Sequence, residues 1–279
     1  MALELSRVGI LGGPGTFAWV AFRRFAAAYG WSCDVQYLGS VESLLASLSQ
    51  GEIDATCLAI QTSHAGFTPL AHEVLRNPSL VPIAEAVLPY NCTLYVREGC
   101  DLGQVRLVLG HQSLELARHW LQKHLPNARL ETRASTIEAA REVAQGEGGL
   151  AVVGSPALSE VVRGLRAQAH GIDGGVVGRW WVIGRQPVAD PMGTRAVVSA
   201  YSVDMREASA FIAECVGRGL HLEGVYAEAH AGPEFRWDLL LLIEGDGSAI
   251  GGLSSQLRAA GRPFVVASQF RGLAVQGIQ

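Results

Sequence analysis

The sequence predicts a mixed α/β protein built from two α/β lobes and a smaller α+β unit. Strand and helix patterns alternate from Arg7 to Gly184, which is typical of parallel sheets. Two long extended segments interrupt this alternation at residues 80–96. A strand–helix–strand–strand–helix–strand order, which is that of ferredoxin-like units, fills the final part of the chain.

The first lobe is expected to contain three strands and two helices. Gly30 and Gly51 each stand where a helix should end, because glycine readily adopts the left-handed conformation found there. Ser40 can cap the second helix through its hydroxyl. The expected elements are a strand at 7–12, a helix at 16–29, a strand at 33–38, a helix at 41–50 and a strand at 55–60.

The second lobe follows a break at 89–91, where the extended segments can carry the chain from one lobe to the other. Ser135 and Glu138 form a capping box at the start of a helix that Gly146 ends. Two lobes joined in this way predict a cleft, and small ligands bind at the carboxyl ends of strands. The other elements are strands at 105–110, 128–132, 149–154 and 179–184, and helices at 113–125 and 155–163.

Residues 185–194 are interpreted as a linker, because they combine prolines and a glycine without apolar periodicity. The expected domains are therefore a cleft-forming domain at 1–186 and a smaller domain at 195–279. The elements expected in the smaller domain are strands at 196–203, 221–230, 235–244 and 264–269, and helices at 206–218 and 249–260.

Composition limits the classes of function. The chain has 279 residues, a formal net charge of −4 and no basic run, so nucleic acid is not an expected partner. No apolar stretch approaches the ~20 residues of a membrane span. Five scattered cysteines fit free thiols in a cytoplasmic protein. Because HExxH, CxxC and P-loop motifs are absent, no metal and no cofactor are expected.

The turn after the first strand leaves three interpretations open. Gly13, Gly15 and Ala18 match the G-x-G-x-x-A pattern of dinucleotide sites, although Pro14 and the lack of an acidic residue after the second strand weigh against it. Free amides and the Thr16 hydroxyl at a helix N-terminus favour an anion such as a carboxylate. The third interpretation is a tight turn with a purely structural role.

Polar residues at two further strand ends are candidates for the same cleft. Gln61, Thr62 and Ser63 follow the third strand, and Ser135 and Thr136 begin a later helix. A polar loop edge and a plain helix cap are the structural alternatives.

Arg179 begins a strand between Gly178 and Trp180, where an unpaired charge would be costly to bury. Its guanidinium could bind a carboxylate through two hydrogen bonds, or it could pair with an acidic side chain for structural reasons. His64 and His111 lie near the expected cleft and are candidates for proton transfer.

Taken in order, these motifs resemble the prephenate dehydratase family over almost the whole chain. No single motif is specific, but the ordered set is. The matching segments are 13–18 (GPGTFA), 59–63 (AIQTS), 110–113 (GHQS), 135–139 (STIEA), 152–155 (VVGS), 164–165 (GL) and 178–180 (GRW), with 243–245 (IEG) in a part that resembles a regulatory ACT domain.

The resemblance implies a periplasmic-binding-protein-like catalytic domain and an ACT-like domain. It also implies a lyase that acts on the small molecule prephenate without a cofactor, as a homodimer. The substrate-binding residues it implies are Gly15, Thr16, Phe17, His111, Ser135, Thr136, Arg179 and Trp180. The catalytic positions it implies are Gln61, Thr62, Ser63, Gly178 and Arg179.

Several of these positions depart from the family pattern. Gly178 stands where the family has its catalytic threonine, and Gln61 and Thr62 replace an acidic residue and an asparagine. Residues 226–229 (YAEA) and 207–211 (EASAF) replace the family's effector-binding motifs. Regulation of the usual kind by phenylalanine is therefore not expected.

These departures suggest a changed reaction. Dehydration of prephenate expels carbon dioxide and hydroxide together, and the family's threonine is expected to assist the departing hydroxyl. Glycine cannot do so, and loss of one well-placed donor commonly costs ~10²–10³ in rate. We expect decarboxylation that keeps the ring hydroxyl, as in the family's non-aromatising decarboxylases of secondary metabolism.

Three alternatives stay open. The first is an ordinary dehydratase that uses Thr62, Ser135 or Thr136 in place of the threonine. The second is action on a relative of prephenate, such as an amino-substituted analogue. The third is a non-catalytic protein that binds small carboxylates.

Overall fold

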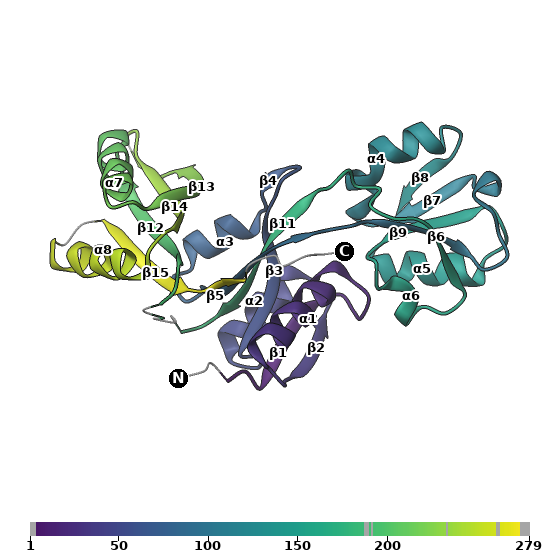
Figure 1. Ribbon diagram of the computed structural model, residues 1–279, viewed down its shortest axis with the longest axis horizontal. Helices are drawn as coiled ribbons and strands as arrows, with labels where there is room; N and C mark the ends of the chain where they lie inside the picture. The colour runs from purple at the N-terminus through teal and green to yellow at the C-terminus, as the bar shows by residue number, and fades with distance from the viewer. Residues whose placement is uncertain (1–3, 187–189, 191, 233, 261–262, 274–279) are drawn as a thin grey trace.

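The computed structural model describes residues 4–186, 190, 192–232, 234–260 and 263–273. Its strands form three separate sheets, which Figure 1 shows spread along the long axis of the molecule. The prediction of a mixed α/β fold with two lobes and a C-terminal βαββαβ unit is confirmed. The three parts are called lobe 1, lobe 2 and the C-terminal unit below.

Lobe 1 holds the largest sheet, with strand order β16-β5-β11-β3-β1-β2 and β4 paired to β3. β1 runs parallel to β2 and β3, whereas β11 runs antiparallel to β3 and β5. The carboxyl ends of β1, β3 and β5 therefore share one sheet edge with the beginning of β11. The elements are β1 (Arg7–Leu11), α1 (Phe17–Tyr29), β2 (Asp34–Leu38), α2 (Val41–Gln50), β3 (Ala55–Thr62), β4 (Gly66–Phe67), α3 (Leu70–Arg76), β5 (Val81–Pro89) and β11 (Val177–Gly184).

Lobe 2 carries a five-stranded sheet in the order β10-β6-β9-β7-β8. Two chain crossings, between β5 and β6 and between β10 and β11, join it to lobe 1 (Figure 1). The elements are β6 (Thr93–Arg97), a 3₁₀ turn (Leu102–Gln104), β7 (Leu107–Gly110), α4 (Ser113–His124), β8 (Arg129–Thr132), α5 (Thr136–Gln145), β9 (Leu150–Gly154), α6 (Leu158–Val161) and β10 (Leu165–Ala169).

The C-terminal unit has the strand order β13-β14-β12-β15, as expected for a ferredoxin-like sheet. Its last strand returns the chain to lobe 1, where β16 (Gly272–Leu273) pairs in parallel with β5. The elements are β12 (Arg195–Val203), α7 (Met205–Gly217), β13 (His221–Ala229), β14 (Trp237–Glu244), α8 (Gly247–Ala260) and β15 (Phe264–Phe270).

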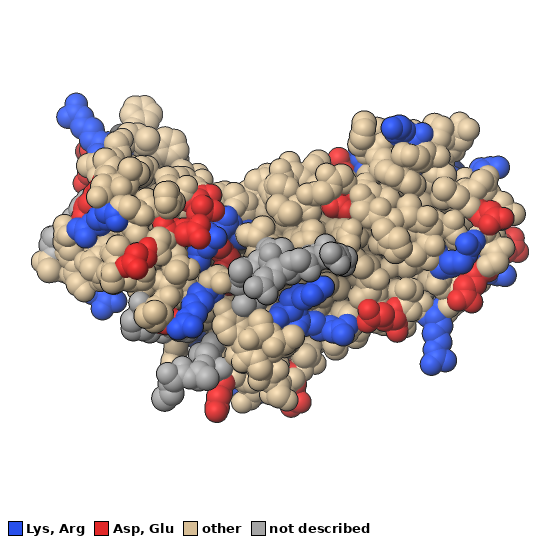
Figure 2. Space-filling view, in the orientation of Figure 1, with Lys and Arg blue, Asp and Glu red and all other residues tan. Residues whose placement is uncertain are grey.

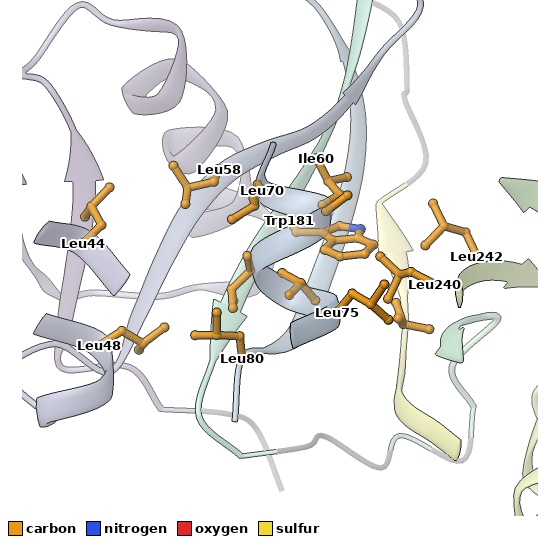
Figure 3. Packing of buried hydrophobic residues seen from close by; sticks show 14 of the residues in the cluster. Leu44, Leu48, Leu58, Ile60, Leu70, Leu75, Leu80, Trp181, Leu240 and Leu242 are labelled. Atoms are coloured by element: carbon orange, nitrogen blue, oxygen red, sulfur yellow. The ribbon is translucent and has the colours of Figure 1, made fainter. Parts of the chain in front are cut away.

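One apolar core joins lobe 1 to the C-terminal unit. Leu70 and Leu75 of α3, Trp181 of β11, and Leu240 and Leu242 of β14 belong to the same buried cluster (Figure 3). A second cluster, with residues of α7 and α8, lies on the other face of the C-terminal sheet. The C-terminal unit therefore packs directly on lobe 1.

The helix α3 lies in a segment where no element was expected. It begins directly after Pro69, and it buries Leu70, Val74 and Leu75. A proline before the first turn and apolar residues four apart are the signals that could have predicted it.

The helix expected at 155–163 is a single short turn, Leu158–Val161. Val162 already has an extended backbone, so the chain can begin the unexpected strand β10 at Leu165. Of the expected linker, residues 187–189 and 191 lie outside the described residues.

The surface mixes both signs of charge. Figure 2 shows acidic and basic side chains interspersed over one face, without a broad basic patch among the residues coloured there. Among the helices in the described part of the chain, none is both long enough and apolar enough to span a membrane.

Candidate functional site

The edge of the lobe 1 sheet that faces lobe 2 is held together by backbone hydrogen bonds. The amide of Ser63, just after β3, donates to the carbonyl of Val177 at 2.9 Å. The amide of Tyr90, just after β5, donates to the carbonyl of Val176 at 3.0 Å. These bonds fix the ends of β3 and β5 against the beginning of β11.

The turn between β1 and α1 depends on two glycines with left-handed backbone, Gly12 (φ 80°) and Gly15 (φ 83°). Thr16 caps α1, since its hydroxyl accepts from the Trp19 amide at 3.3 Å and donates to the Gly13 carbonyl at 2.8 Å. The hydroxyl is thus engaged within the turn. The first backbone amides of α1 are left as donors for an anion.

The beginning of α1 contacts lobe 2 at Gly15. The Ser155 hydroxyl donates to the Gly15 carbonyl at 2.6 Å. A Cβ placed on Gly15 would lie 3.5 Å from Cδ1 of Ile137, in the first turn of α5. Ser135 caps that turn by accepting a backbone amide at 3.1 Å. Two helix N-termini, one from each lobe, therefore meet at the cleft.

Two further expected residues lie in lobe 2, and neither lines the cavity described below. Thr136 begins α5 and is buried, and His111 follows β7 and is partly exposed. Both stand at carboxyl ends of strands in the lobe 2 sheet, as the sequence suggested.

The polar residues after β3 hold the local backbone. The Thr62 hydroxyl accepts from the Ala65 amide at 3.0 Å. The Ser63 hydroxyl accepts from the Val177 amide at 3.1 Å. Their hydroxyl oxygens therefore stabilise the β3–β4 turn and the contact with β11.

Of the other expected residues, Arg179 contacts Gln61, and its remaining partners are acidic side chains that the sequence analysis did not name. Its guanidinium donates to Glu85 at 2.7 Å, to Gln61 at 3.1 Å and to Glu223 of the C-terminal unit at 3.3 Å. The Arg179 side chain is only 10% exposed and that of Glu85 only 4%. Trp181 also donates to Glu85. Arg179 and Trp181 therefore lie on the same face of the sheet, the face that packs against the C-terminal unit.

Gly178 and Trp180 face the opposite side, toward α1. A Cβ placed on Gly178 would lie 2.7 Å from Cε2 of Tyr90 and 2.8 Å from Nε1 of Trp180. Such distances are too short for ordinary contacts, so two aromatic rings occupy the space of a side chain at this position. A threonine side chain at this position would not fit without moving them.

Tyr90 and Trp180 line a cavity of about 520 Å³ between the lobes. Phe17 of α1 and Pro156 of lobe 2 form other parts of its wall. The Tyr90 ring lies 5.0 Å from that of Phe17 and 5.7 Å from that of Trp180, measured between centroids. The sequence analysis named Phe17 and Trp180 but missed Tyr90, whose only signal was its place at the break between the extended segments.

Arginines of α1 also reach this cavity, and they too were missed. Arg23 pairs with Glu160 of lobe 2 at 3.0 Å, which bridges the lobes at the cavity wall. Arg24 lines the same cavity and has no ion-pair or hydrogen-bond partner among the residues that the structure describes. Arg24 is therefore available to a carboxylate.

Burial raises the pKa of Tyr90 to about 12, with a smaller contribution from neighbouring Cys92. The phenol is therefore protonated at neutral pH and can act as a hydrogen-bond donor. No group of histidine, cysteine and carboxylate side chains suited to a metal ion occurs within the described part of the chain.

Known sequences match this chain over most of its length. A family model described as prephenate dehydratase matches residues 8–188. A prephenate dehydratase of Amycolatopsis methanolica is 29% identical over 232 residues, which cover 81% of this chain and 75% of that protein. One from Mycolicibacterium gilvum is 31% identical over 175 residues, but the match spans only 56% of that protein.

Solved structures share the fold. Prephenate dehydratase of Arthrobacter aurescens in complex with L-Phe has a TM-score of 0.76 at 21% identity, covering 95% of this chain and 90% of that one. The enzyme of Staphylococcus aureus reaches 0.77 at 15% identity, covering 95% and 100%. A protein described as GqqA, a novel type of quorum quenching acylase, also reaches 0.77, at 16% identity over 96% and 98%. Structural likeness alone therefore does not decide the reaction.

Proposed function

The chain belongs to the prephenate dehydratase family, a family of lyases, and from this premise we propose that it removes carbon dioxide from prephenate while the ring hydroxyl stays in place. The product is then a non-aromatic hydroxylated ring that keeps its pyruvyl side chain. Such a product serves secondary metabolism rather than the synthesis of phenylalanine.

The single observation that carries this proposal is the packing at Gly178. The sequence resemblance implies a threonine at this position in the family, and in this chain Tyr90 and Trp180 occupy the space that such a side chain would need. The site therefore lacks the aliphatic hydroxyl that would assist departure of the ring hydroxyl. Loss of such a donor typically slows the assisted step by ~10²–10³, while binding and decarboxylation can persist.

Positive groups around the cavity support binding of a dicarboxylate. The N-termini of α1 and α5 lie on the two sides of the contact between Gly15 and Ile137, and helix N-termini favour anions. Arg24 adds a full positive charge on the cavity wall. We assign the carboxylate-binding role to Arg24, because the guanidinium of Arg179 is already paired with Glu85.

Ordinary dehydration to phenylpyruvate is the second candidate, and the names of the sequence relatives favour it. It needs another group to assist the departing hydroxyl. The hydroxyls of Thr62 and Ser135 are engaged in a turn and a helix cap, and Thr136 is buried. None of the three residues lines the cavity beside Tyr90 and Trp180, and this position weighs against them as the replacement.

The two candidates differ in their product. The protein is mixed with prephenate at neutral pH, and carbon dioxide, product mass and aromatic absorbance are followed together. We expect a product lighter by carbon dioxide alone and without an aromatic ring. Phenylpyruvate would establish the dehydratase, and ligand-induced stabilisation without turnover would indicate a binding protein. The cytoplasmic location and the homodimer stay predictions.

A further inference from the structure

The ring of Tyr90 lies at the place that a side chain on residue 178 would occupy. Its Cζ, the atom that bears the hydroxyl, lies 3.3 Å from the position of a Cβ on Gly178. The same ring lines the cavity between the lobes. The ring that fills this region therefore belongs to the residue that follows β5, and it replaces a side chain from β11.

The ring has little freedom to turn away. It packs between Phe17 and Trp180, and the amide of the same residue is bonded to Val176 at 3.0 Å. Tyr90 and Phe17 both pack against the apolar cores of lobe 1 and lobe 2. A donor on a ring held in this way has a fixed orientation, which favours proton transfer to a bound substrate.

Two hydrogen-bond donors beside the cavity have no partner among the residues that the structure describes. Within the described part of the chain, neither the Tyr90 hydroxyl nor Nε1 of Trp180 has a hydrogen-bond partner. Neither atom is among the buried, unpaired side-chain atoms of the described residues, so both donors stay open to a ligand that enters the cavity.

On this basis, and resting on the proposed decarboxylation, we propose that Tyr90 is the general acid that protonates the substrate ring. The bond between the ring carbon and its carboxylate breaks, carbon dioxide leaves, and the electron pair left on that carbon delocalises over the two ring double bonds that flank it. The Tyr90 O–H bond then breaks as its proton forms a new C–H bond at one end of that system. The phenolate regains a proton from water, so no oxidant or cofactor is needed.

Trp180 has a supporting role in this arrangement. Its indole N–H lies 2.8 Å from the position of a Cβ on Gly178, close to the same part of the cavity. It can donate to the retained ring hydroxyl or to a carboxylate, but an indole does not release a proton to carbon. Trp180 is therefore a positioning residue.

Other donors suggested by the sequence are placed less well. The Ser63 hydroxyl accepts from the Val177 amide, and Ser63 does not line the cavity. His64 is exposed on the β3–β4 turn, and neither His64 nor His111 belongs to the cavity wall. Tyr90 is the proton-bearing side chain that combines a cavity position with a fixed ring.

The test compares Tyr90→Phe with wild type in the prephenate reaction, and uses Tyr37→Phe on β2, whose side chain is exposed, as the matched control. General acids typically contribute 10²–10⁴ in rate, so we expect kcat of Tyr90→Phe to fall by about that factor with little change in KM. Tyr37→Phe should keep the wild-type kcat. In deuterated water, wild type should place one deuterium on a single face of the ring, and residual product of Tyr90→Phe should carry it on both faces.

The outcomes separate this assignment from the proposed function. If wild type is active and the kcat of Tyr90→Phe stays within a factor of about 10 of the wild-type value, the role of Tyr90 is wrong but the proposed function stands. The same conclusion follows if Tyr90→Phe keeps the facial selectivity of wild type. A wild type that releases no carbon dioxide above the spontaneous rate overturns the proposed function and this role together. If Tyr90→Phe does not fold, an unselective deuterium label in the wild-type product still overturns the role.

Discussion

At the scale of single residues, the packing around Gly178 leaves no space for a side chain. The missing Cβ of Gly178 would lie 2.7 Å from the Tyr90 ring. We expect Gly178→Thr to lower the free energy of unfolding by about 1–3 kcal/mol, because overpacking forces neighbouring rings to shift. Urea unfolding measures this loss. In combination with Tyr90→Ala, the loss should be smaller than the sum of the two single losses. A fully stable Gly178→Thr protein would show that the rings move aside freely.

Substitutions of Arg24 and Arg179 are expected to have opposite effects on stability and KM, although both residues are arginines of lobe 1. Arg179→Ala leaves Glu85, only 4% exposed, with a weakened set of partners, so unfolding free energy should fall by about 3 kcal/mol while KM changes little. Arg24→Ala should raise KM by about 10- to 100-fold with little loss of stability, because a charged hydrogen bond to the substrate is removed. Urea unfolding and steady-state kinetics on both variants give the comparison. The reverse pattern would return the carboxylate-binding role to Arg179.

At the scale of elements, two helix caps offer a matched pair. Thr16 caps α1 at the cleft, and Ser40 caps α2 away from it. Either alanine substitution should lower the free energy of unfolding by about 1 kcal/mol. Only Thr16→Ala should also raise KM, because the amides at the start of α1 lose their fixed direction. Equal KM values in the two variants would argue that the α1 N-terminus does not contact substrate.

Local signals explain which elements could be predicted from the sequence. Helices α1, α2 and α5 have caps at Thr16, Ser40 and Ser135 that the pattern shows directly. The helix α3 was missed although Pro69 precedes it.

The side-chain directions around β11 were harder to predict. The pairing of β3 with β11 shifts between Arg179 and Trp180, and such a bulge has no clear mark in the sequence. The sequence placed Arg179 at the start of a strand, whereas β11 begins at Val177, and it could not give the face to which the Arg179 side chain points. Tyr90 was missed for a related reason, because its contact with Gly178 joins residues from separate strands.

At the scale of the whole molecule, acidic residues tie the C-terminal unit to lobe 1. Burial raises the pKa of the Glu223 carboxyl, but hydrogen bonds and charges of Arg179 and Arg195 outweigh it and leave the pKa below its usual value of 4.5. For Glu228, burial is likewise outweighed by His72 and Arg76. Both carboxylates are thus stabilised in the folded protein in their charged form.

The sign of the pH dependence follows from these lowered values. The stabilisation is fully present above the usual pKa of 4.5 and is lost as pH falls through the lower pKa of the folded state. Thermal unfolding from neutral to acid pH should show a decline that is shallower in the double variant Glu223→Gln and Glu228→Gln. The exposed pair Glu98→Gln and Glu147→Gln, with the same change in charge, should follow wild type. Identical profiles in all three proteins would contradict this account.

The central claim is that the oxygen atom of the prephenate ring hydroxyl stays in the product, and an isotope label on that oxygen tests it directly. Prephenate that carries heavy oxygen in its ring hydroxyl is converted by the protein, and the label is measured in the product and in the solvent. We predict that the label stays in a product that has lost only carbon dioxide, because no side-chain hydroxyl at Gly178 assists its departure. Label released into water together with phenylpyruvate would contradict the claim.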